Sequence, residues 1–386
     1  MKNLVFTCIS ALLFSCTSYA QDIKDQHYKF SPKVELEYTP IKDQYRSGTC
    51  WSFATISFLE SELLRLNKGT FDLSEMYYVH QAYNQKASKF IRYHGSYNFG
   101  PGGQAHDVLD IIRQNGIITQ EQYSGIPSGN NNKPDHGEMD EILSGFLKSL
   151  GNTKSGKLSS QWPIAFNAIL ESYMGKLPES NKINSYGLNV DDYVEITSYT
   201  HHPFYSRFIL EIPDNWSGGS YYNVPIDELI QIINYSLENG YSICWDGDVS
   251  DRGFSHSNSL AIVPAFQPFS NSATEMEKWE KMTEKEKGEM VYDFKYVRNE
   301  REITQQMRQE AFDNYQTTDD HLMHLVGKVV DQNGKTYFIT KNSWSDKSNQ
   351  TGGLLNMSEA FVKLNTVAIM VHKDGIPVDL KNKLNL

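Results

Sequence analysis

Basic charge, cysteine and long apolar runs are all scarce in this chain of 386 residues. Lys and Arg together number 36 against 47 Asp and Glu, and the formal net charge is -11 at pH 7. Phosphate contacts need clustered Lys and Arg, so this balance argues against nucleic acid as a partner. The chain still has 39% hydrophobic residues and enough length to bury a full core, which excludes a disordered protein and a small disulfide scaffold.

Metal-ligand spacings are also missing from the sequence. The chain contains His201-His202, His136 and His256, but no His-Glu-x-x-His or Cys-x-x-Cys pattern accompanies them. We therefore predict no metal and no cofactor.

The N-terminus has the pattern of a secretory signal peptide. A short basic start precedes an apolar run from Leu4 to Phe14, and Ser18-Tyr19-Ala20 offers small residues around a cleavage point. We expect residues 1–20 to be removed on export, so that the remaining chain, residues 21–386, is periplasmic or secreted. The apolar run is too short for a permanent transmembrane helix, which takes roughly 20 apolar residues, and no other segment comes close to that length.

A second interpretation of the N-terminus is a lipoprotein. Leu13-Phe14-Ser15-Cys16 resembles a lipoprotein cleavage box, which would leave a lipidated Cys16 and a membrane-tethered protein. The bulky Phe14 weakens this alternative.

Cysteine usage singles out one thiol. Cys8 and Cys16 lie within the signal segment, which leaves Cys50 and Cys244, too few for a disulfide framework. Cys244 lies in an apolar, strand-like run, where cysteine behaves as a small hydrophobe. Export environments oxidise idle thiols, so a lone cysteine kept in a distinctive local sequence, as Cys50 is, indicates a working thiol.

Helical patterns dominate the first two thirds of the chain. Apolar spacing and a glycine stop predict a helix over 50–66 that opens at Cys50, and a glycine-rich turn at Gly100 to Gly103 precedes another helix. Residues 125–160 are rich in Gly, Asn, Ser and Lys and predict an irregular excursion. Further helices are predicted over 74–93, 104–115, 161–174, 225–239 and, as a solvated helix, 274–290.

Strand patterns gather toward the C-terminal end. Strands are predicted over 192–200, 241–245, 322–330 and 336–341, and Asn333-Gly334 is a strong hairpin signal between the last two. Helices lead and a sheet follows, which is the α+β pattern, in which a helical half and a sheet half meet along a cleft.

The residues around Cys50 predict acyl-transfer chemistry. A thiol is a nucleophile only as the thiolate, which a helix N-terminus and an imidazolium both stabilise, so Cys50 needs a histidine from elsewhere in the chain. Gln44 lies six residues earlier, close enough for its amide to reach an oxyanion beside the Cys50 main-chain N–H. Asn342 can hold the tautomer of a C-terminal histidine. These residues form a candidate Cys/His/Asn constellation in which Cys50 attacks a carbonyl.

Four segments carry a resemblance to papain-like cysteine peptidases. The segment from Gln44 to Ala54 resembles the nucleophile segment of that family, Asp320 to Gly327 its histidine strand, Lys341 to Trp344 its asparagine motif, and Pro101 to Gly103 its glycine pair. The resemblance implies an α+β fold with a helical left half and an antiparallel right half that flank a cleft.

The resemblance also implies roles for individual residues. Cys50 would be the nucleophile, His321 the general base and acid, and Asn342 its orienting partner, with Gln44 in the oxyanion hole. In addition, Gly102 and Gly103 would bind the substrate backbone, and Trp344 would shield the histidine–asparagine hydrogen bond. A peptide or protein would be the substrate.

Other segments are similar to the bleomycin hydrolase and aminopeptidase C group, namely Leu73-Ser74-Glu75, Gly102-Gly103-Gln104, 241–249 and 371–377. That group inserts helices into the papain fold, here expected over 125–225. Its members are typically cytosolic hexamers, so a homo-oligomer is one expectation, whereas the export signal leaves the assembly open. The group's C-terminal arm, which restricts it to peptide N-termini, is expected to be absent because the chain stops at Leu386. Exopeptidase and endopeptidase action therefore both stay open.

Two histidines compete for the role of the base. A tight loop at Asn333-Gly334 would bring Asn342 opposite Leu325 or His324, and would leave His321 roughly 13 Å further along the strand. The family pattern instead places the histidine six residues before Gly327, which selects His321, and a bulge would correct the register.

Two other functions remain as alternatives to a peptidase. One is a peptide-binding protein that kept the papain fold and lost turnover, although no catalytic residue is substituted. The other is a Cys/His acyltransferase, against which the glycine pair and the Asn-Ser-Trp run argue.

Overall fold

The computed structural model describes residues 27–126, 133–153, 156–179, 184–268 and 272–386. The predicted signal peptide, residues 1–20, and the alternative lipidation site at Cys16 lie outside the described residues. Among the helices that are described, none combines the length and the apolar character that a membrane crossing requires.

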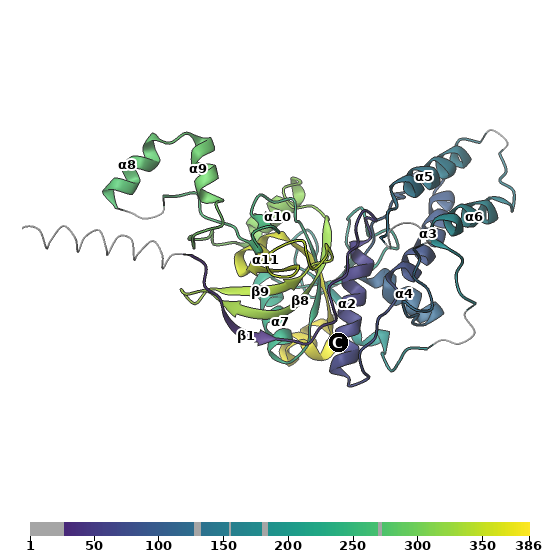
Figure 1. Cartoon of the computed structure of the whole chain (residues 1–386), viewed down its shortest axis with the longest axis horizontal. Coiled ribbons are helices and arrows are strands. Elements are labelled where there is room, and N and C mark those ends of the chain that lie inside the picture. Colours follow the sequence, from purple (N-terminus) through teal and green to yellow (C-terminus); the bar gives the residue numbers. More distant parts are fainter. Residues whose placement is uncertain (1–26, 127–132, 154–155, 180–183, 269–271) are drawn as a thin grey trace, which may run out of the picture.

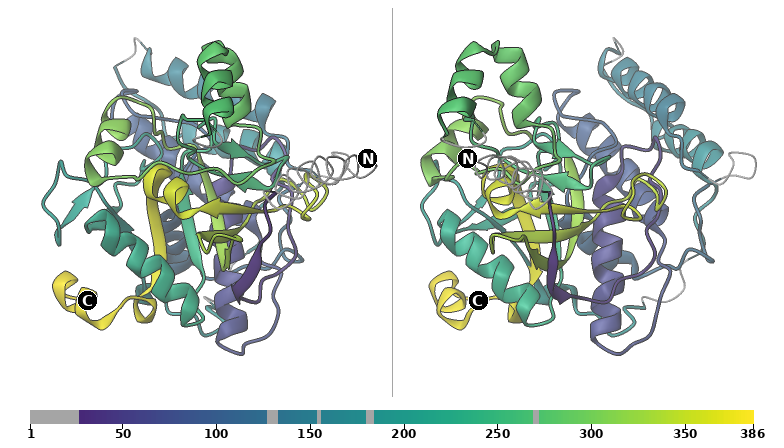
Figure 2. Two further views of the ribbon diagram at one scale, coloured as in Figure 1. Left: turned by 90° about the vertical axis from the view of Figure 1, so that its left-hand side faces the viewer. Right: turned by 60° about the vertical axis from the view of Figure 1, so that its left-hand side comes forward.

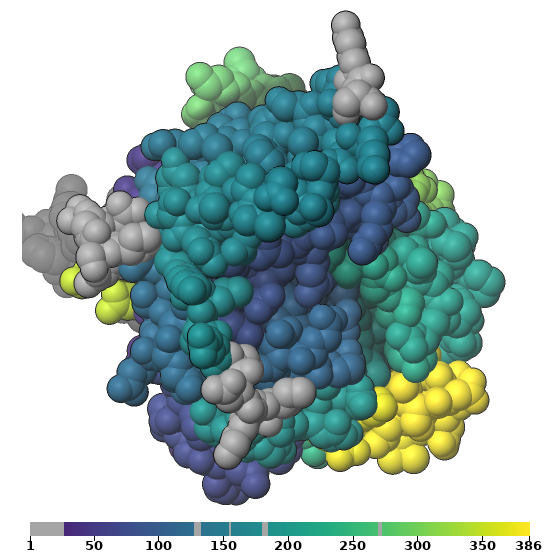
Figure 3. Space-filling model, turned by 90° about the vertical axis from the view of Figure 1, so that its right-hand side faces the viewer, coloured from purple at the N-terminus to yellow at the C-terminus, as the bar shows by residue number. Residues whose placement is uncertain are grey.

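Helices α3 to α6 lie on one side of the molecule and the sheet lies on the other, and α2 (Cys50–Arg65) runs between them (Figure 1). The helical side, which forms the face seen in Figure 3, contains α3 to α6. The helices of this side are α3 (Glu75–Arg92), α4 (Ala105–Asn115), α5 (Gly137–Gly151) and α6 (Trp162–Met174).

The sheet side contains one large mixed sheet in the order β3-β4-β2-β11-β5-β8-β9-β10-β7-β6, with β1 also paired to β8. The strands are β1 (Ser31–Glu35), β2 (Tyr193–Thr197), β3 (Arg207–Ile209), β4 (Ser220–Asn223), β5 (Ile243–Gly247), β6 (Phe254–Ser255), β7 (Leu260–Ala261), β8 (His321–Val330), β9 (Thr336–Lys341), β10 (Leu354–Ser358) and β11 (Thr366–His372). The remaining helices are α7 (Ile226–Glu238), α8 (Ala273–Lys281), α9 (Glu284–Val291), α10 (Gln305–Asp313), α11 (Glu359–Asn365) and α12 (Val378–Leu384), with short 3-10 turns at Val190–Asp192 and Lys373–Gly375. This is the α+β, papain-like fold that the sequence predicted.

Strand β8 is the centre of the sheet and is covered on both faces. It pairs antiparallel with β5 and β9, and α2 and α7 both pack against it. Eight of its ten residues are buried. Because both faces of the strand are covered, its apolar residues do not alternate with exposed polar ones. The site is built at the end of this strand where β8 begins, next to the N-terminal end of α2.

Local sequence fixes where the helices of the site begin and end. Ser74 caps α3 by accepting a hydrogen bond from the Tyr77 main-chain N–H, at 3.1 Å. Gln104 begins α4 in a reciprocal capping arrangement with Asp107, and Gly116 ends it with φ of 79°. The glycine stop and the turn at 100–103 were therefore correct signals in the sequence.

The elements predicted from the sequence are largely present, with two corrections. Residues 125–160 were expected to be irregular, but they contain the helix α5, whose buried residues Met139, Leu143 and Leu147 recur at intervals of four. This spacing was the overlooked signal. The single helix expected over 274–290 is two helices, α8 and α9, which project from the sheet side (Figure 2). Thr283 begins α9 with a capping box and so interrupts the run.

The expected insertion over 125–225 contains α5 and α6 and also β2 to β4. Strand β2 pairs with β11 of the main sheet, and β4 pairs with β2. The latter part of this range is therefore strands rather than helices. The boundaries of the insertion stay a prediction.

A buried charge network ties the segment before Cys50 to the helices. Glu60, in the middle of α2 and 1% exposed, accepts hydrogen bonds from Thr39 Oγ1 and from the Leu73 main-chain N–H. Lys42 Nζ lies 3.4 Å from Glu60 Oε1 and 2.5 Å from Glu75 Oε1. Burial would lower the pKa of Lys42, but the two carboxylates reverse the effect and raise it. This network holds the chain that leads into Gln44.

We expect Glu60→Ala to lower the free energy of unfolding by about 2–4 kcal/mol, because Lys42, Thr39 and the Leu73 N–H would lose a buried partner. Equilibrium unfolding in urea measures this change. Glu277→Ala is the matched control, since Glu277 is 68% exposed and forms only an i,i+4 pair with Lys281. A Glu60 variant as stable as that control would contradict the structural role of the network.

Candidate active site

Cys50 is the first residue of α2 and is 9% exposed. At the start of a helix its main-chain N–H has no partner within the helix and points toward solvent or a ligand. Thr49, the preceding residue, caps the helix without a side-chain hydrogen bond. The Leu322 main-chain N–H acts on the Cys50 sulfur from β8 and lowers its pKa. The thiol therefore lies beside Leu322, the residue that follows His321 in β8.

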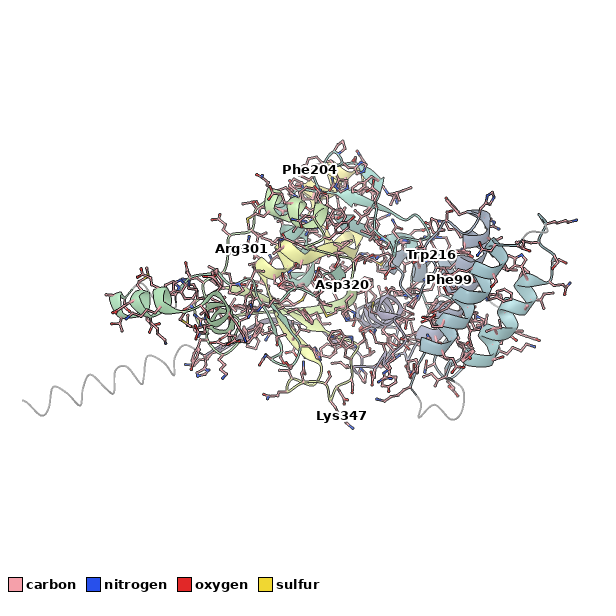
Figure 4. The ribbon with its side chains drawn as sticks, turned by 90° about the horizontal axis from the view of Figure 1, so that it is seen from above. Phe99, Phe204, Trp216, Arg301, Asp320 and Lys347 are labelled. Carbon is pink, nitrogen blue, oxygen red and sulfur yellow. The ribbon has the colours of Figure 1, made fainter. Side chains whose placement is uncertain are left out.

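His321 begins β8 and pairs with Asn342, which follows β9. His321 Nε2 lies 2.8 Å from Asn342 Oδ1, and both residues are buried. With Nε2 donating to that oxygen, Nδ1 is the nitrogen left to accept a proton. The Trp344 ring covers the pair, with its centroid 4.9 Å from the His321 ring and an interplanar angle of 31°. Asp320, the neighbour of His321, is labelled in Figure 4 near the boundary between the two sides.

His324 lies on the other face of β8, away from Asn342. Its Nδ1 is 2.9 Å from Ser57 Oγ, and its ring stands edge-on to Phe58 of α2. The register pairs His324 with Lys341, and a bulge between Leu325 and Gly327 shifts the hairpin by one residue. The tight-loop argument that favoured His324 omitted this bulge.

Gln44 is fixed by two hydrogen bonds to Ser343. Its main-chain N–H donates to the Ser343 carbonyl at 2.8 Å, and its Oε1 accepts from Ser343 Oγ at 2.5 Å. With Oε1 engaged, the Nε2 amide has no acceptor within the described part of the chain. It is therefore available to donate to an oxyanion near Cys50.

The glycine pair packs against Trp51 and Lys86. Trp51 Nε1 donates to the Pro101 carbonyl at 2.9 Å, and a Cβ at Gly103 would lie 3.0 Å from the Trp51 ring. Lys86 Nζ donates to the Gly102 carbonyl and, at 2.9 Å, to the Gly100 carbonyl. A glycine is needed at 103 because the indole leaves no room for a side chain.

Burial dominates the electrostatics of the two candidate catalytic groups. Burial raises the pKa of the Cys50 thiol to about 12, the Leu322 N–H opposes this, and the carboxyl groups of Asp246, Asp214 and Asp319 raise it further. Burial lowers the pKa of His321 to about 4, although the Asn342 hydrogen bond opposes that shift. Both shifts favour the uncharged forms, a thiol and an imidazole.

Several groups near the site could not be predicted from the sequence. Asp214 lies in the loop between β3 and β4, Asp246 in β5 and Asp319 just before β8, and no spacing pattern connects them. His256 was considered only as a metal ligand, but its Nδ1 is 3.3 Å from Asn342 Nδ2. This contact orients Asn342.

A surface group of His201, His202 and Glu211 brings three potential metal-ligand atoms within 4.8 Å of one another. His202 Nε2 lies 3.2 Å from Glu211 Oε1, and His201 Nε2 lies 3.4 Å from Glu211 Oε2. The sequence offered the two histidines but not Glu211. All three side chains are at least partly exposed, and we assign them no function.

Comparison with known proteins agrees with this geometry. The family described as papain family cysteine protease matches residues 29–161, a range that contains Gln44, Cys50 and the glycine pair. Aminopeptidase G of Lactobacillus delbrueckii subsp. lactis is 21% identical over 403 residues, covering 91% of this chain and 85% of that protein. The mitochondrial cysteine proteinase 1 of Saccharomyces cerevisiae is 26% identical over 121 residues, covering 27% of this chain and 25% of its own.

Among solved structures, PepW from Lactobacillus rhamnosis HN001 superposes with a TM-score of 0.68 at 17% identity, covering 97% of this chain and 91% of that one. This likeness concerns the fold. Together with the match of residues 29–161 to the papain family model, it shows that the chain has a papain-like fold. The match to aminopeptidase G is in line with the resemblance to the bleomycin hydrolase and aminopeptidase C group noted in the sequence.

The carboxylates beside Cys50 predict an effect on thiol reactivity. Asp214→Asn removes a negative charge that disfavours the thiolate, so the pKa of Cys50 should fall and its alkylation by iodoacetamide near pH 8 should be about three- to tenfold faster. Mass spectrometry of the Cys50 peptide as a function of pH measures the rate, and buried Cys244 is an internal reference.

Asp379→Asn removes the same charge from an exposed position on α12 and is the control. It should leave the pH profile of Cys50 alkylation unchanged. An Asp214→Asn profile that coincides with the control, or that moves to higher pH, would contradict the electrostatic argument.

Proposed function

We propose that the chain hydrolyses peptide bonds through Cys50, His321 and Asn342, with Gln44 completing an oxyanion hole. The observation that carries this proposal is the His321–Asn342 hydrogen bond of 2.8 Å at the start of β8, beside the thiol at the N-terminal end of α2. It leaves His321 Nδ1 as a proton acceptor next to a nucleophile, the arrangement that acyl transfer requires.

The first half of the reaction forms a thioester. Cys50 Sγ bonds to the carbonyl carbon of the scissile peptide while its proton passes to His321 Nδ1. The carbonyl oxygen gains negative charge and accepts hydrogen bonds from the Cys50 main-chain N–H and Gln44 Nε2. The C–N bond then breaks, and His321 returns the proton to the leaving amine.

The second half releases the acid. A water molecule gives a proton to His321 and bonds to the thioester carbonyl, and the C–S bond then breaks. The proton returns to the Cys50 sulfur, which restores the neutral pair. Asn342 keeps the imidazole in one tautomer throughout, and Trp344 excludes water from that hydrogen bond. No step in this sequence requires a cofactor.

We further propose that the enzyme acts as an aminopeptidase, removing residues from peptide N-termini. The support is the relative named aminopeptidase G, which aligns over 91% of this chain. Its identity of 21% is too low to settle the substrate by itself, so the substrate is argued from this chain's own residues in the next section.

The two histidines of β8 provide a matched pair of variants. His321→Ala should lower kcat by about 10³-fold or more, because the thiol loses its general base. His324→Ala should retain turnover within a few fold, because His324 contacts Ser57 and Phe58 instead of Asn342. Steady-state hydrolysis of aminoacyl 4-nitroanilides measures both, with Cys50→Ser as the inactive reference.

Far-ultraviolet circular dichroism of the variants controls for folding. Full activity in folded His321→Ala, or equal loss in both histidine variants, would contradict the assignment. Wild-type protein that binds peptides at Cys50 without turnover would instead indicate a non-catalytic peptide-binding protein.

We also propose that the protein is exported, because residues 1–20 have the three regions of a signal peptide. Expression of the whole chain in a Gram-negative host should yield periplasmic protein that begins at Gln21, as read by N-terminal sequencing. A lipid-modified N-terminus at Cys16 would favour the lipoprotein interpretation, and uncleaved protein retained in the cytosol would contradict export.

A further inference from the structure

Three carboxylates from distant parts of the chain gather beside Cys50. Asp214 comes from the loop between β3 and β4, Asp246 from β5, and Asp319 from the residues just before β8. The fields of all three reach the thiol, as its raised pKa shows. None of the three belongs to the proposed catalytic set. We call them the Asp214–Asp246–Asp319 cluster.

Asp319 accepts hydrogen bonds from two neutral donors and also contacts the Asp246 carboxyl group. Its Oδ1 accepts from Gln104 Nε2 at 3.1 Å, and its Oδ2 accepts from the Asp214 main-chain N–H at 3.3 Å. Gln104 follows the glycine pair directly, and Tyr221 Oη donates to its Oε1 at 3.3 Å. The two hydrogen bonds tie the cluster to the glycine turn, but they do not neutralise the charge.

Asp246 is the most deeply buried member of the cluster, at 3% exposed. Its carboxyl oxygens have no close hydrogen-bond partner among the described residues, but the Asp319 carboxyl and the Gln104 amide lie near enough to act on its pKa. It stands opposite Leu322 in the β5–β8 ladder, so it faces the same side of the sheet as the residue whose N–H reaches Cys50. Within the described ranges, none of the three carboxylates forms an ion pair. Buried carboxyl groups are normally paired or fully hydrogen-bonded, and here Asp246 has only an amide and a second carboxyl group beside it, so the cluster has room for a cationic ligand.

The glycine turn leaves no room for a substrate backbone that extends past the residue before the scissile bond. A Cβ at Gly102 would collide with the Asp214 carboxylate, which therefore lies directly on that residue. The Gly102 carbonyl already accepts a hydrogen bond from Lys86. The place where the family resemblance put the substrate backbone is thus occupied by a negative charge. Trp216, two residues after Asp214, lies against this region between the two sides of the molecule (Figure 4).

We infer that the Asp214–Asp246–Asp319 cluster binds the free α-ammonium group of a peptide and so restricts cleavage to its first residue. This inference rests on the proposed peptidase function. In such a substrate the ammonium nitrogen is two bonds from the attacked carbonyl carbon, a distance of about 2.5 Å. Its binding site must therefore adjoin the nucleophile, and the cluster does. Asp214 then takes the space that a preceding residue would need.

The charge state of the cluster fits a cationic ligand. Burial and the Asp214 charge raise the pKa of Asp319 to about 7, and burial with the neighbouring carboxylates raises the pKa of Asp246 well above its usual range. Lys86 is a cation that interacts with Asp214, but it also interacts electrostatically with Asp107 and Asp140. A bound ammonium would favour the ionised carboxylates and would add a cation to the one that Lys86 already provides near Asp214.

Paired substrates test the inference by kinetics. Alanine and leucine 4-nitroanilides are compared with their N-acetyl forms, which differ only in the charge of the α-nitrogen. We expect the wild-type protein to prefer the free amines, and Asp319→Asn and Asp214→Asn to lower kcat/KM for free amines about 30-fold or more, mainly through KM. The acetylated substrates should not lose activity in these variants. Asp379→Asn is the charge-matched control.

Three outcomes would overturn the inference. One is wild-type cleavage of acetylated substrates as fast as free amines. Another is an equal loss on both substrate types in Asp319→Asn and Asp214→Asn, which is the result of a merely structural role. The last is rapid cleavage of N-acetyl-arginyl-leucine 4-nitroanilide, which would make the cluster a pocket for a basic side chain.

A binding measurement separates this inference from the proposed function. Cys50→Ser protein is titrated with leucinamide and with N-acetyl-leucinamide in a calorimeter. Tighter binding of leucinamide, lost in the Cys50→Ser/Asp319→Asn double variant, supports the ammonium site even where no hydrolysis is measured. Equal binding of both amides overturns the site while leaving Cys50-dependent hydrolysis intact.

Discussion

The packing of the N-terminal end of α2 against the start of β8 is the constraint on which the rest of the structure depends. Cys50 is the first residue of α2 and His321 is the first residue of β8. Their side chains can meet only if the start of the helix lies next to the start of the strand. A shift of α2 by one residue would move the thiol by about 1.5 Å and turn it by about 100°. Hydrophobic packing prevents this shift, because the buried side chains of α2 share one core cluster with Leu322 of β8, whereas Met323 and Leu325 of β8 lie in another.

Much of the site could be predicted from the sequence because it depends on short local motifs. The helix start at Cys50, the distance to Gln44 and the glycine turn before α4 each depend on a few adjacent residues. The α+β order followed from helical spacing giving way to strand patterns. Helix α5 escaped detection because its Gly, Ser and Lys content resembles a loop, although its apolar residues recur at a helical interval.

The other features of the site depend on long-range packing, which local patterns in a single sequence do not predict. The choice between His321 and His324 depended on a bulge between Leu325 and Gly327, which shifts the register of the β8–β9 hairpin by one residue. The Asp214–Asp246–Asp319 cluster is harder still, since its members come from three separate elements. In the sequence each is an ordinary Asp, and only the fold makes them neighbours.

The cluster carries an energetic cost that its proposed ligand would offset. Three carboxylates near Cys50 disfavour the thiolate and therefore slow the attack on a carbonyl. An ammonium bound among them cancels part of that field at the moment when the scissile carbonyl arrives. The same positive charge would then serve both for recognition of the substrate N-terminus and for activation of the nucleophile. A substrate without that charge would bind more weakly, and the Cys50 thiol would react with it more slowly. The selectivity for free amines would accordingly exceed what the ion pair alone provides, because the same charge acts on binding and on the barrier to attack.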